Sequence, residues 1–359
     1  MGIKILHCAD LHIGASLSSL GFSAEKRGAE ILRTLGSIVN CCKENSVRLL
    51  IIAGDLFDSN HINSQTLTAV FDYFASIPET VVAVTPGNHD FLSADSPYAE
   101  SFPENVHIFK EAGSIEVDGV TVHGIPFLSA YSEGFNLPKA ENGVNILIMH
   151  GDLSGGPYNP LTEAALAESG MDYIALGHVH KYSGINRADK TYWAYPGCPE
   201  PLGFDELGEK GVIIGTVSEN ECSLEFMPLS AREYKEIYLD ISDFTEQNEV
   251  LSAARALLEK ERNHLIKLIL SGENDLILDT AFLQTALENE CFYLKVRNRT
   301  HEKINLEVLK NEQSLKGIFV KKMLDLYDKA DDAEKEKILS SMYLALAAFD
   351  RREVSFDEN

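Results

Sequence analysis

The sequence predicts a layered α/β domain, followed by a smaller α+β unit and by helices towards the C-terminal end. Over the first half of the chain, short apolar runs alternate with helical stretches. After Pro228 the order changes to strand, helix and strand, and from Leu306 the sequence is helical and highly charged. We therefore expect three parts, residues 1–228, 229–304 and 305–359.

The expected strands of the first part are short and apolar on both faces, as in strands that are buried within layers. They are Ile3–Cys8, Leu49–Ala53, Val81–Thr85, Ile146–Met149 and Tyr173–Leu176. Helices are expected over Glu25–Asn45 and Ser64–Ser76, because apolar residues recur there at helical spacing. A hairpin with strands Ser114–Val117 and Val120–Gly124 is expected around the turn Asp118-Gly119.

In the second part, strands and helices alternate. We expect strands over Tyr234–Ile241, Leu265–Leu270 and Cys291–Val296, and helices over Gln247–Glu261 and Thr280–Asn289.

The third part is expected to form two helices, the second over Ala333–Phe349. The first carries an apolar stripe that includes Ile318, Phe319, Met323 and Leu326. This stripe can either dock on a partner's coiled coil or pack on the preceding unit.

The composition limits the function classes. The formal net charge of −24 argues against broad, unassisted binding to nucleic acid, although local basic patches or a bound metal remain compatible with it. Six scattered cysteines without a CxxC pair indicate reduced thiols and a cytoplasmic protein. No apolar run reaches the roughly 20 residues that span a bilayer, and the strand at Ile3 leaves no room for a signal peptide.

Polar side chains follow each of the five expected strands. The segments are Asp10-Leu11-His12, Gly54-Asp55-Leu56-Phe57-Asp58, Gly87-Asn88-His89-Asp90, His150-Gly151-Asp152 and Gly177-His178-Val179-His180. The carboxyl ends of strands form the functional edge of an open α/β sheet, so we expect these groups to converge there. Any one segment is a weak signal, but five in this order favour a site.

The residue types indicate the chemistry of that site. Imidazole and carboxylate groups suit zinc, manganese and iron, and a soft thiolate site is disfavoured. Two cations about 3.5–4 Å apart need a shared ligand, for which Asp55 is the best candidate. The remaining expected ligands are Asp10, His12 and His180 for one ion and Asn88, His150 and His178 for the other.

His89 has no vacancy in either set of ligands. We expect it to protonate a leaving oxygen or to stabilise the transition state of phosphate-ester cleavage. Asp58 is expected to orient and charge His89, with a plain turn residue as the alternative. Asp90 is either a partner of His89 or a helix cap.

The ordered motifs DLH, GDLFD, GNHD, H and GHVH resemble those of the calcineurin-like metallophosphoesterase superfamily. They span Asp10 to His180, about half of the chain. The resemblance implies a four-layer α/β/β/α sandwich with a two-metal centre, and the expected ligands match its positions.

A narrower set of residues resembles the SbcD-type DNA repair nucleases, and among them the YhaO-like branch. These residues are Ala9–Gly14, Arg27, Leu50–Phe57, Tyr195–Pro199 and Phe204–Gly211. The resemblance implies manganese-supported exonuclease or endonuclease cleavage of DNA, a DNA-capping domain after Pro228 and an SbcC-like coiled-coil ATPase partner. It also implies a possible homodimer that pairs through the first two expected helices.

Three function classes follow. The first is the DNA nuclease, whose candidate DNA contacts are Lys26, Arg27, Arg33, Lys181, Tyr182, Arg297, Arg299 and Lys303. The second is a phosphoesterase for a small phosphodiester or phosphomonoester; Ser59 and Asp90 argue against a phosphoprotein phosphatase, which usually carries Arg and Glu there. The third is a non-catalytic scaffold for an ATPase, which the intact ligand set disfavours.

Overall fold

A computed structural model shows two compact units. The residues that it describes are 2–134, 136–219, 221–301 and 305–349. One unit comprises Met1–Lys235 with Asn263–Ile266, and the other comprises Glu236–Arg262 with Lys267–Asn359. The boundary thus lies inside a strand, a few residues after the change of texture at Pro228.

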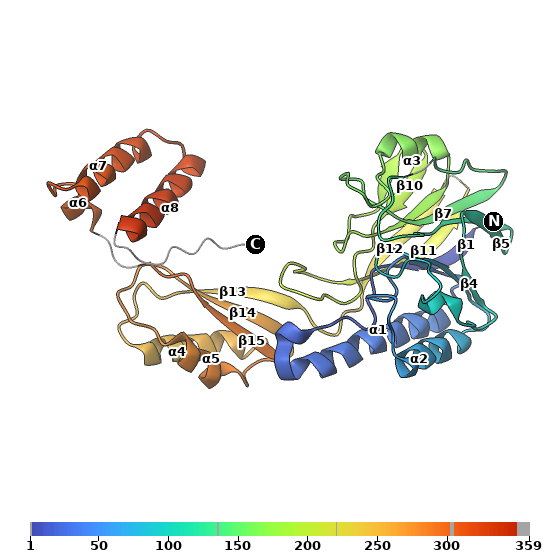
Figure 1. Cartoon of the computed structure of the whole chain (residues 1–359), viewed down its shortest axis with the longest axis horizontal. Coiled ribbons are helices and arrows are strands. Elements are labelled where there is room, and N and C mark those ends of the chain that lie inside the picture. The colour runs from blue at the N-terminus through green and yellow to red at the C-terminus, as the bar shows by residue number, and fades with distance from the viewer. Residues whose placement is uncertain (1, 135, 220, 302–304, 350–359) are drawn as a thin grey trace. The chain divides into compact units, whose positions relative to one another are not determined.

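The first unit contains two six-stranded sheets (Figure 1). The first sheet has the order β12-β11-β1-β2-β3-β4, in which β1 to β4 are parallel and β11 is antiparallel to β1. Its strands are β1 (Ile3–Cys8), β2 (Leu49–Ala53), β3 (Val81–Thr85), β4 (Val106–Ile108), β11 (Gly211–Ser218) and β12 (Glu221–Pro228). The bounds expected for β1, β2 and β3 are confirmed, whereas β4, β11 and β12 were not predicted from the sequence.

The second sheet has the order β5-β6-β7-β8-β10-β9. Its strands are β5 (Gly113–Val117), β6 (Val120–Ile125), β7 (Val144–His150), β8 (Tyr173–Gly177), β9 (Asn186–Ala188) and β10 (Thr191–Ala194). The expected hairpin is confirmed: Asp118 and Gly119 have φ angles of 50° and 77°, the left-handed pair of a type I′ turn.

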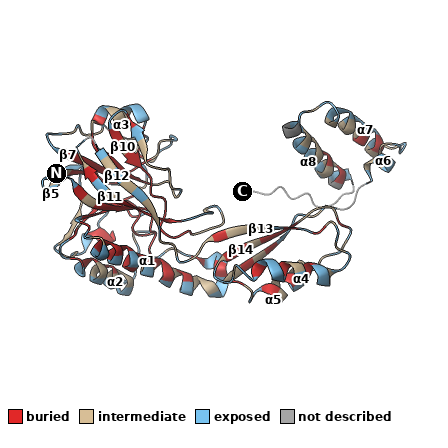
Figure 2. Cartoon of the chain, turned by 180° about the vertical axis from the view of Figure 1, so that it is seen from behind, coloured by how far each residue is buried: buried red, intermediate tan, exposed pale blue. Residues whose placement is uncertain are grey.

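The two sheets pack face to face over one apolar core. Ile5 and Ile51 of the first sheet are buried in it together with Val122 and Ile148 of the second. Figure 1 shows α1 (Ala24–Glu44) and α2 (Ser64–Ala75) on one side of the sheets and α3 (Glu163–Ser169) on the other. The expected four-layer sandwich is therefore confirmed. Figure 2 shows buried residues concentrated in the strands.

One polar group crosses between the sheets. His7 on β1 lies 2.8 Å from the Tyr173 hydroxyl of β8 through Nδ1, and 3.2 Å from the Leu176 carbonyl through Nε2. A carbonyl only accepts, so Nε2 carries the proton and Nδ1 accepts from Tyr173. This satisfied pair ties the end of β8 to β1, three residues before Asp10.

The second unit contains a three-stranded sheet, β13-β14-β15, with α4 and α5, and three further helices. The elements are β13 (Tyr234–Asp240), α4 (Gln247–Leu258), β14 (Leu265–Ser271), α5 (Thr280–Leu287), β15 (Tyr293–Asn298), α6 (Leu306–Leu309), α7 (Leu315–Tyr327) and α8 (Asp332–Phe349). The expected order of strands and helices is confirmed. Helix was expected from Leu306 onward, and the structure divides that stretch into α6 and α7, a break that was not expected.

The helical segment has a small core of its own. Val320 of α7 and Met342 and Leu346 of α8 are buried together, and Phe319 and Met323 pack against them. Of the apolar stripe, Ile318 and Leu326 remain exposed, by 56% and 55%. The stripe therefore divides, with two residues packing inside the helical segment and two facing solvent.

Candidate metal centre

The carboxyl ends of β1, β2, β3, β7 and β8 carry the polar segments that the sequence analysis singled out. Four residues of these segments adopt positive φ angles, which L-residues rarely do. They are Asp10 (54°), His12 (46°), Asp55 (51°) and His178 (105°). Such strained backbone clusters at functional sites, because it is retained only where the side chains must point in fixed directions.

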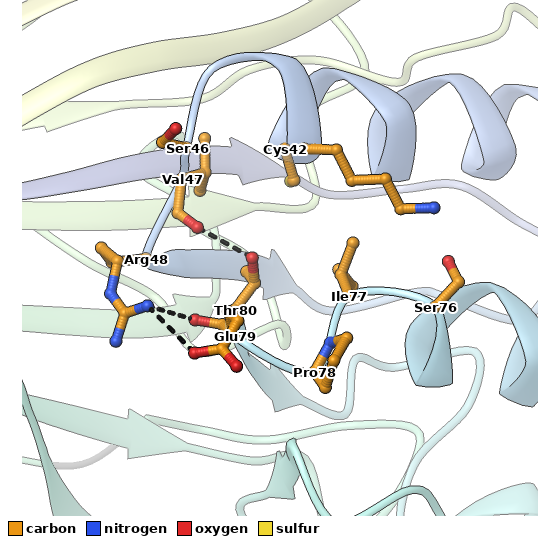
Figure 3. A pocket seen from close by; sticks show the side chains of 10 residues that line it. Cys42, Ser46, Val47, Arg48, Ser76, Ile77, Pro78, Glu79 and Thr80 are labelled. Carbon is orange, nitrogen blue, oxygen red and sulfur yellow. Dashed lines mark hydrogen bonds and ion pairs between the residues drawn. The ribbon is translucent and has the colours of Figure 1, made fainter.

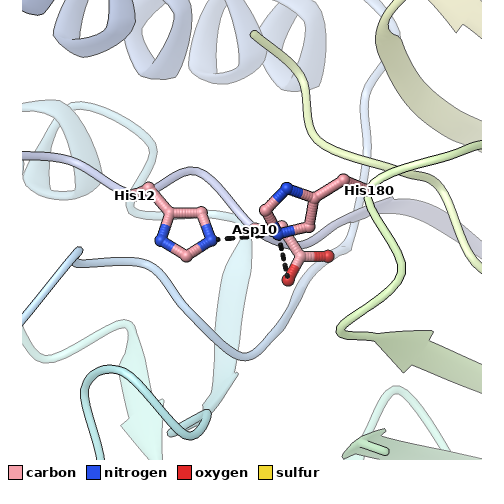
Figure 4. A group of neighbouring side chains, drawn as sticks. All are labelled: Asp10, His12 and His180. Atoms are coloured by element: carbon pink, nitrogen blue, oxygen red, sulfur yellow. Dashed lines mark hydrogen bonds and ion pairs between the residues drawn. The ribbon is translucent and has the colours of Figure 1, made fainter. Parts of the chain in front are cut away.

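Asp10, His12 and His180 form the first group of side chains (Figure 4). The Nε2 atoms of His12 and His180 lie 3.2 Å apart, and His180 Nε2 lies 3.8 Å from Asp10 Oδ1. Asp10 and His12 are buried, while His180 retains 29% exposure. Two imidazole nitrogens aimed at each other beside a carboxylate form a donor set suited to a cation.

Asn88, His150 and His178 form the second group. Asn88 Oδ1 lies 2.9 Å from His150 Nε2 and 3.3 Å from His178 Nδ1. The other nitrogen of His150, Nδ1, lies 3.0 Å from the Ala53 carbonyl, which fixes Nε2 as the nitrogen that faces the site. A carbonyl behind the ring is the arrangement expected for a metal-binding histidine.

Asp55 lies between the two groups. Its Oδ2 atom is 3.7 Å from His12 Nε2 and 3.3 Å from His150 Nε2. Its Oδ1 atom accepts a hydrogen bond of 3.0 Å from the His89 backbone N–H. One carboxylate oxygen thus faces a histidine of each group, which is the geometry of a shared ligand.

The pKa values of the buried groups show which charge the cluster favours. Burial acts most strongly and lowers the pKa of His150, but Asp55 and Asp10 outweigh it and raise that pKa to about 9. Burial likewise lowers the pKa of His180, and the hydrogen bond to Glu206 followed by Asp10 raises it to about 9. The pKa of Asp55 is lowered, because His150 and other histidines offset its burial. The cluster favours added positive charge, as a cation site must.

His89 and Asp58 do not pair as expected. His89 Nδ1 lies 3.2 Å from the backbone carbonyl of Asp58, not from its carboxylate. The Asp58 carboxylate faces His12 instead, with Oδ1 3.3 Å from Nδ1. His89 itself is exposed beside the cluster, and its ring centroid lies 4.8 Å from that of His12. Asp58 therefore orients His12 with its side chain and His89 with its backbone.

Asp90 is neither a partner of the His89 side chain nor a helix cap. Its buried carboxylate accepts hydrogen bonds from the Gly87 and Phe57 backbone N–H groups at 2.7 and 3.0 Å. It also accepts one from the Tyr98 hydroxyl at 2.5 Å. Burial raises the pKa of Asp90 to about 6. Asp90 thus holds the second and third motif loops together, a role that needs the tertiary structure to be seen.

Glu206 contacts the proposed metal ligand His180, and the sequence alone did not single it out. Its Oε1 atom lies 2.5 Å from His180 Nδ1, and its Oε2 atom accepts from the Leu202 backbone N–H at 2.7 Å. Cys198 Sγ lies 3.4 Å from the same Oε2. Glu206 fixes the His180 ring so that Nε2 faces Asp10. The only sequence signal was its place in the run Phe204–Gly211.

The candidate DNA contacts fare differently. Arg27 is fully buried, where its guanidinium contacts Glu200 at 2.5 Å and Glu30 at 3.3 Å. The prediction that Arg27 contacts DNA is wrong, because a helix that packs on the sheets turned this position inward. Tyr182 is half-buried and stacks on Phe226 with ring centroids 4.4 Å apart, so one face of its ring is not open to a base.

The other candidates are surface residues. Arg33 is 61% exposed and lies 3.9 Å from Glu30. The remaining exposed candidates are Lys26, Lys181, Arg297 and Arg299. Lys303 lies outside the described residues.

A cavity of about 430 Å³ lies away from these groups (Figure 3). Arg48 and Thr80, which directly precede β2 and β3, contribute to its lining. Arg48 donates to the Glu79 carbonyl at 2.7 Å, and Thr80 donates to the Val47 carbonyl at 2.8 Å. The cavity therefore lies at the amino ends of the strands, one strand length from the polar cluster.

Sequence comparison identifies the family. A model of the calcineurin-like phosphoesterase family matches residues 3–182, half of the chain, and this range includes every expected metal ligand. The chain belongs to this family. Its members are metal-dependent hydrolases of phosphoester bonds, so the chain is a hydrolase of that kind, and the Asp and His clusters are its candidate sites for divalent metal.

Several relatives lie on a nuclease-related branch. The chain is 27% identical over 295 residues to the uncharacterized metallophosphoesterase YhaO of Bacillus subtilis, covering 75% of this chain and 72% of that protein. It is 28% identical over 237 residues to the DNA double-strand break repair protein Mre11 of Methanopyrus kandleri, covering 58% of this chain and 51% of that protein. The chain thus spans about half the length of that Mre11 relative.

A solved structure with a similar arrangement is TT1561 of Thermus thermophilus. It has a TM-score of 0.41 and 11% sequence identity, and the match covers 63% of this chain and 99% of that one. Among the described residues, none of the helices combines the length and the apolar character that crossing a bilayer requires.

Proposed function

We propose that the chain is a two-metal phosphodiesterase that cleaves DNA, as an SbcD-like exonuclease or endonuclease subunit in DNA repair. The observation that carries the two-metal part is the position of Asp55, whose Oδ2 atom faces His12 at 3.7 Å and His150 at 3.3 Å. In this proposal Asp55 is the shared ligand. Asp10, His12 and His180 complete one set, and Asn88, His150 and His178 complete the other.

Two divalent ions held by these residues would neutralise charge on the phosphate and activate a water molecule. The donor set of imidazole, carboxylate and amide groups suits Mn²⁺, Fe²⁺ and Zn²⁺. Mn²⁺ is proposed among them because the resemblance to the SbcD-type nucleases implies manganese-supported cleavage. The paired groups behind the ligands, such as the Ala53 carbonyl and Glu206, hold the rings in place before substrate arrives.

His89 is the proposed acid for the leaving oxygen. It is exposed at the cluster, while its backbone N–H is fixed by Asp55 at 3.0 Å. The Asp58 carbonyl, 3.2 Å from Nδ1, accepts the proton of that nitrogen, so Nε2 is the nitrogen left to carry the proton for the leaving oxygen. Asp58 has a positioning role in this proposal.

The choice of DNA as substrate rests on the relatives. Relatives named as Mre11 double-strand break repair proteins match 58% and 79% of this chain at 28% and 25% identity. The exposed Lys26, Arg33 and Lys181 are the proposed phosphate contacts of the first unit, together with Tyr182, which follows Lys181 in the sequence. A smaller role for charge than in most nucleases is expected, given the net charge of −24.

The same proposal includes partners and location. The helical segment 305–359 is proposed to bind an SbcC-like coiled-coil ATPase, supported by the exposed Ile318 and Leu326 on α7. Residues 229–304 are proposed as a DNA-capping domain, with Arg297 and Arg299 exposed on β15. A homodimer is proposed through α1 and α2. All six cysteines are described and unpaired, which supports a cytoplasmic location.

A second candidate function is hydrolysis of a small phosphodiester or phosphomonoester. Burial of Arg27 favours it, because the loss of one candidate cation weakens the case for a long phosphate backbone. The two functions share the metal centre and differ only in the substrate.

Hydrolysis assays with added manganese test these proposals. The substrates are linear duplex DNA, single-stranded DNA and bis-p-nitrophenyl phosphate, and the enzymes are wild type, Asp55→Ala and His89→Ala. We expect wild type to degrade DNA, and each variant to lose about 10²-fold or more of that activity. Ester hydrolysis without DNA cleavage would favour the small-substrate function. Bound metal without any hydrolysis would leave the scaffold function.

A further inference from the structure

A short stack of aromatic rings begins at the metal centre and ends at the surface. The ring of Tyr158 lies beside that of His178, with centroids 4.8 Å apart and planes inclined by 35°. The ring of Tyr131 follows, 5.7 Å from Tyr158 and inclined by 36°. Tyr158 is half-buried and Tyr131 is 64% exposed. The stack thus leads from a proposed metal ligand to open solvent.

The backbone holds both tyrosines in place. Ser132, next to Tyr131, donates its N–H to the Pro157 carbonyl at 2.8 Å, and its carbonyl accepts from the Asn159 N–H at 3.0 Å. These bonds form a bridge between Ser132 and Tyr158. The two loops are therefore paired like a short piece of sheet, so the rings are not on independent, freely moving segments.

The second loop is also tied to the metal centre itself. The side chain of Asn159 donates from Nδ2 to the His150 carbonyl at 2.9 Å, and the Tyr158 carbonyl accepts from the Asp152 N–H at 3.0 Å. Tyr158 is thus fixed relative to the end of β7 as well as to His178. Tyr131 is therefore held through Tyr158 and its loop to the proposed metal ligands His150 and His178.

We propose that Tyr131 and Tyr158 form a stacking platform for a nucleobase next to the scissile phosphate of a DNA strand. This inference rests on the proposed DNA substrate and adds how that substrate is gripped. Aromatic rings bind bases through their faces, without attracting the phosphates and without preferring one base. Such a grip suits a chain with a net charge of −24, in which Coulomb attraction to a polyanion is weak.

The position of the exposed Tyr131 ring indicates that a nucleobase is the group that stacks on it. The ring of Tyr131 is exposed and lies against the ring of Tyr158, which in turn contacts the proposed metal ligand His178. It therefore offers a stacking site for one flat group. In a DNA strand the flat group closest to each phosphate is the neighbouring base. Tyr158 acts mainly by supporting Tyr131 and His178, so Tyr131 is the residue through which to test the platform.

The test compares two oligomers that have the same phosphates. One is single-stranded oligothymidylate and the other is its abasic analogue, which carries tetrahydrofuran in place of every nucleoside. With manganese present, we expect Tyr131→Ala to raise KM for oligothymidylate about tenfold, the order of effect of removing one ring under a base. The same variant is expected to cleave the abasic oligomer like wild type.

Two controls separate stacking from damage to the loop. Tyr131→Phe keeps the ring and is expected to match wild type on both oligomers. Leu128→Ala removes another exposed side chain, 65% accessible, from the same loop and is expected to change neither KM.

The outcomes distinguish the platform from the DNA substrate. Equal KM values of Tyr131→Ala and wild type on oligothymidylate, or an equal loss on both oligomers, would overturn the platform and leave DNA cleavage standing. Wild type that hydrolyses bis-p-nitrophenyl phosphate but neither oligomer would overturn the DNA substrate itself.

Discussion

The two units use their polar side chains in different ways. In the first unit, Asp10, Asp55 and His150 are buried at strand ends and contact one another. In the second unit, charged groups such as Lys267 and Glu236 pair in the partly exposed region of the three-stranded sheet. Buried polar groups require fixed partners, whereas exposed ones are screened by water. The buried cluster of candidate metal ligands therefore lies in the first unit.

Exposed apolar side chains show the reverse distribution. In the described residues, the first unit exposes only a few large ones, including Phe22 and Tyr131, although it holds most of the chain. The second unit exposes more, and among them Leu315, Ile318 and Leu326 belong to one helix. Clustered exposed apolar residues mark interaction surfaces. In the described residues, the buried cluster of candidate metal ligands and most of the exposed large apolar side chains therefore lie in different units.

Metal removal is expected to have the largest effect and to separate the units. A chelator should reduce phosphodiester hydrolysis about 10³-fold, since both sets of ligands lose their cations. Restored manganese at about 100 times its Kd should slow hydrogen exchange at the His89 and His178 amides about 100-fold. Those amides bond to Asp55 and Asp10. Amides of β14, in the second unit, should not change, and a similar change there would break the comparison.

Loss of the carboxylate behind His180 should have an intermediate effect. Glu206→Ala leaves His180 Nδ1 without its partner at 2.5 Å, so the ring can turn away from Asp10. We expect manganese affinity, measured by titration calorimetry, to fall about 10- to 100-fold. Glu206→Gln keeps an acceptor oxygen and should lose less. Glu209→Ala, an exposed neighbour in the same loop, is the matched control; equal losses in Glu206→Ala and Glu209→Ala would contradict a positioning role.

The buried His7 is expected to give a pH dependence of stability, which leaves the metal centre unchanged. Burial lowers the pKa of His7 from 6.5 to about 3, so the unfolded chain binds a proton more readily than the folded one. Stability is therefore lost as the pH falls below about 6.5, by up to about 1.4 kcal/mol per pH unit, until about pH 3.

Denaturant titrations between pH 7 and pH 4.5 measure this dependence. His7→Gln should reduce the slope of unfolding free energy against pH. Tyr173→Phe removes the hydroxyl partner but keeps His7 buried, and should retain the slope. If the slope of unfolding free energy against pH is unchanged in His7→Gln, groups other than His7 cause the loss of stability at low pH.

The sequence by itself determined the elements that carry the site. Leu49–Ala53, for example, was predicted with its correct bounds, because a strand that is apolar throughout and buried on both faces has no polar residue to blur its limits. The motif residues follow the strands directly, so their convergence within each sheet could be predicted from the rule that strand ends share an edge. That the edges of the two sheets meet depends on how the sheets pack. The turn at Asp118-Gly119 was equally local.

Only the tertiary structure decided which groups stand behind the ligands. The contacts of Glu206 with His180, of Asp90 with Phe57 and of Tyr158 with His178 join segments that are 20 to 33 residues apart. The burial of Arg27 depended on which face of α1 packs inward, and its charge gave no sign of it. Local sequence sets strand ends and turns through nearby sterics, whereas these contacts arise from the packing of distant segments, which no short pattern encodes.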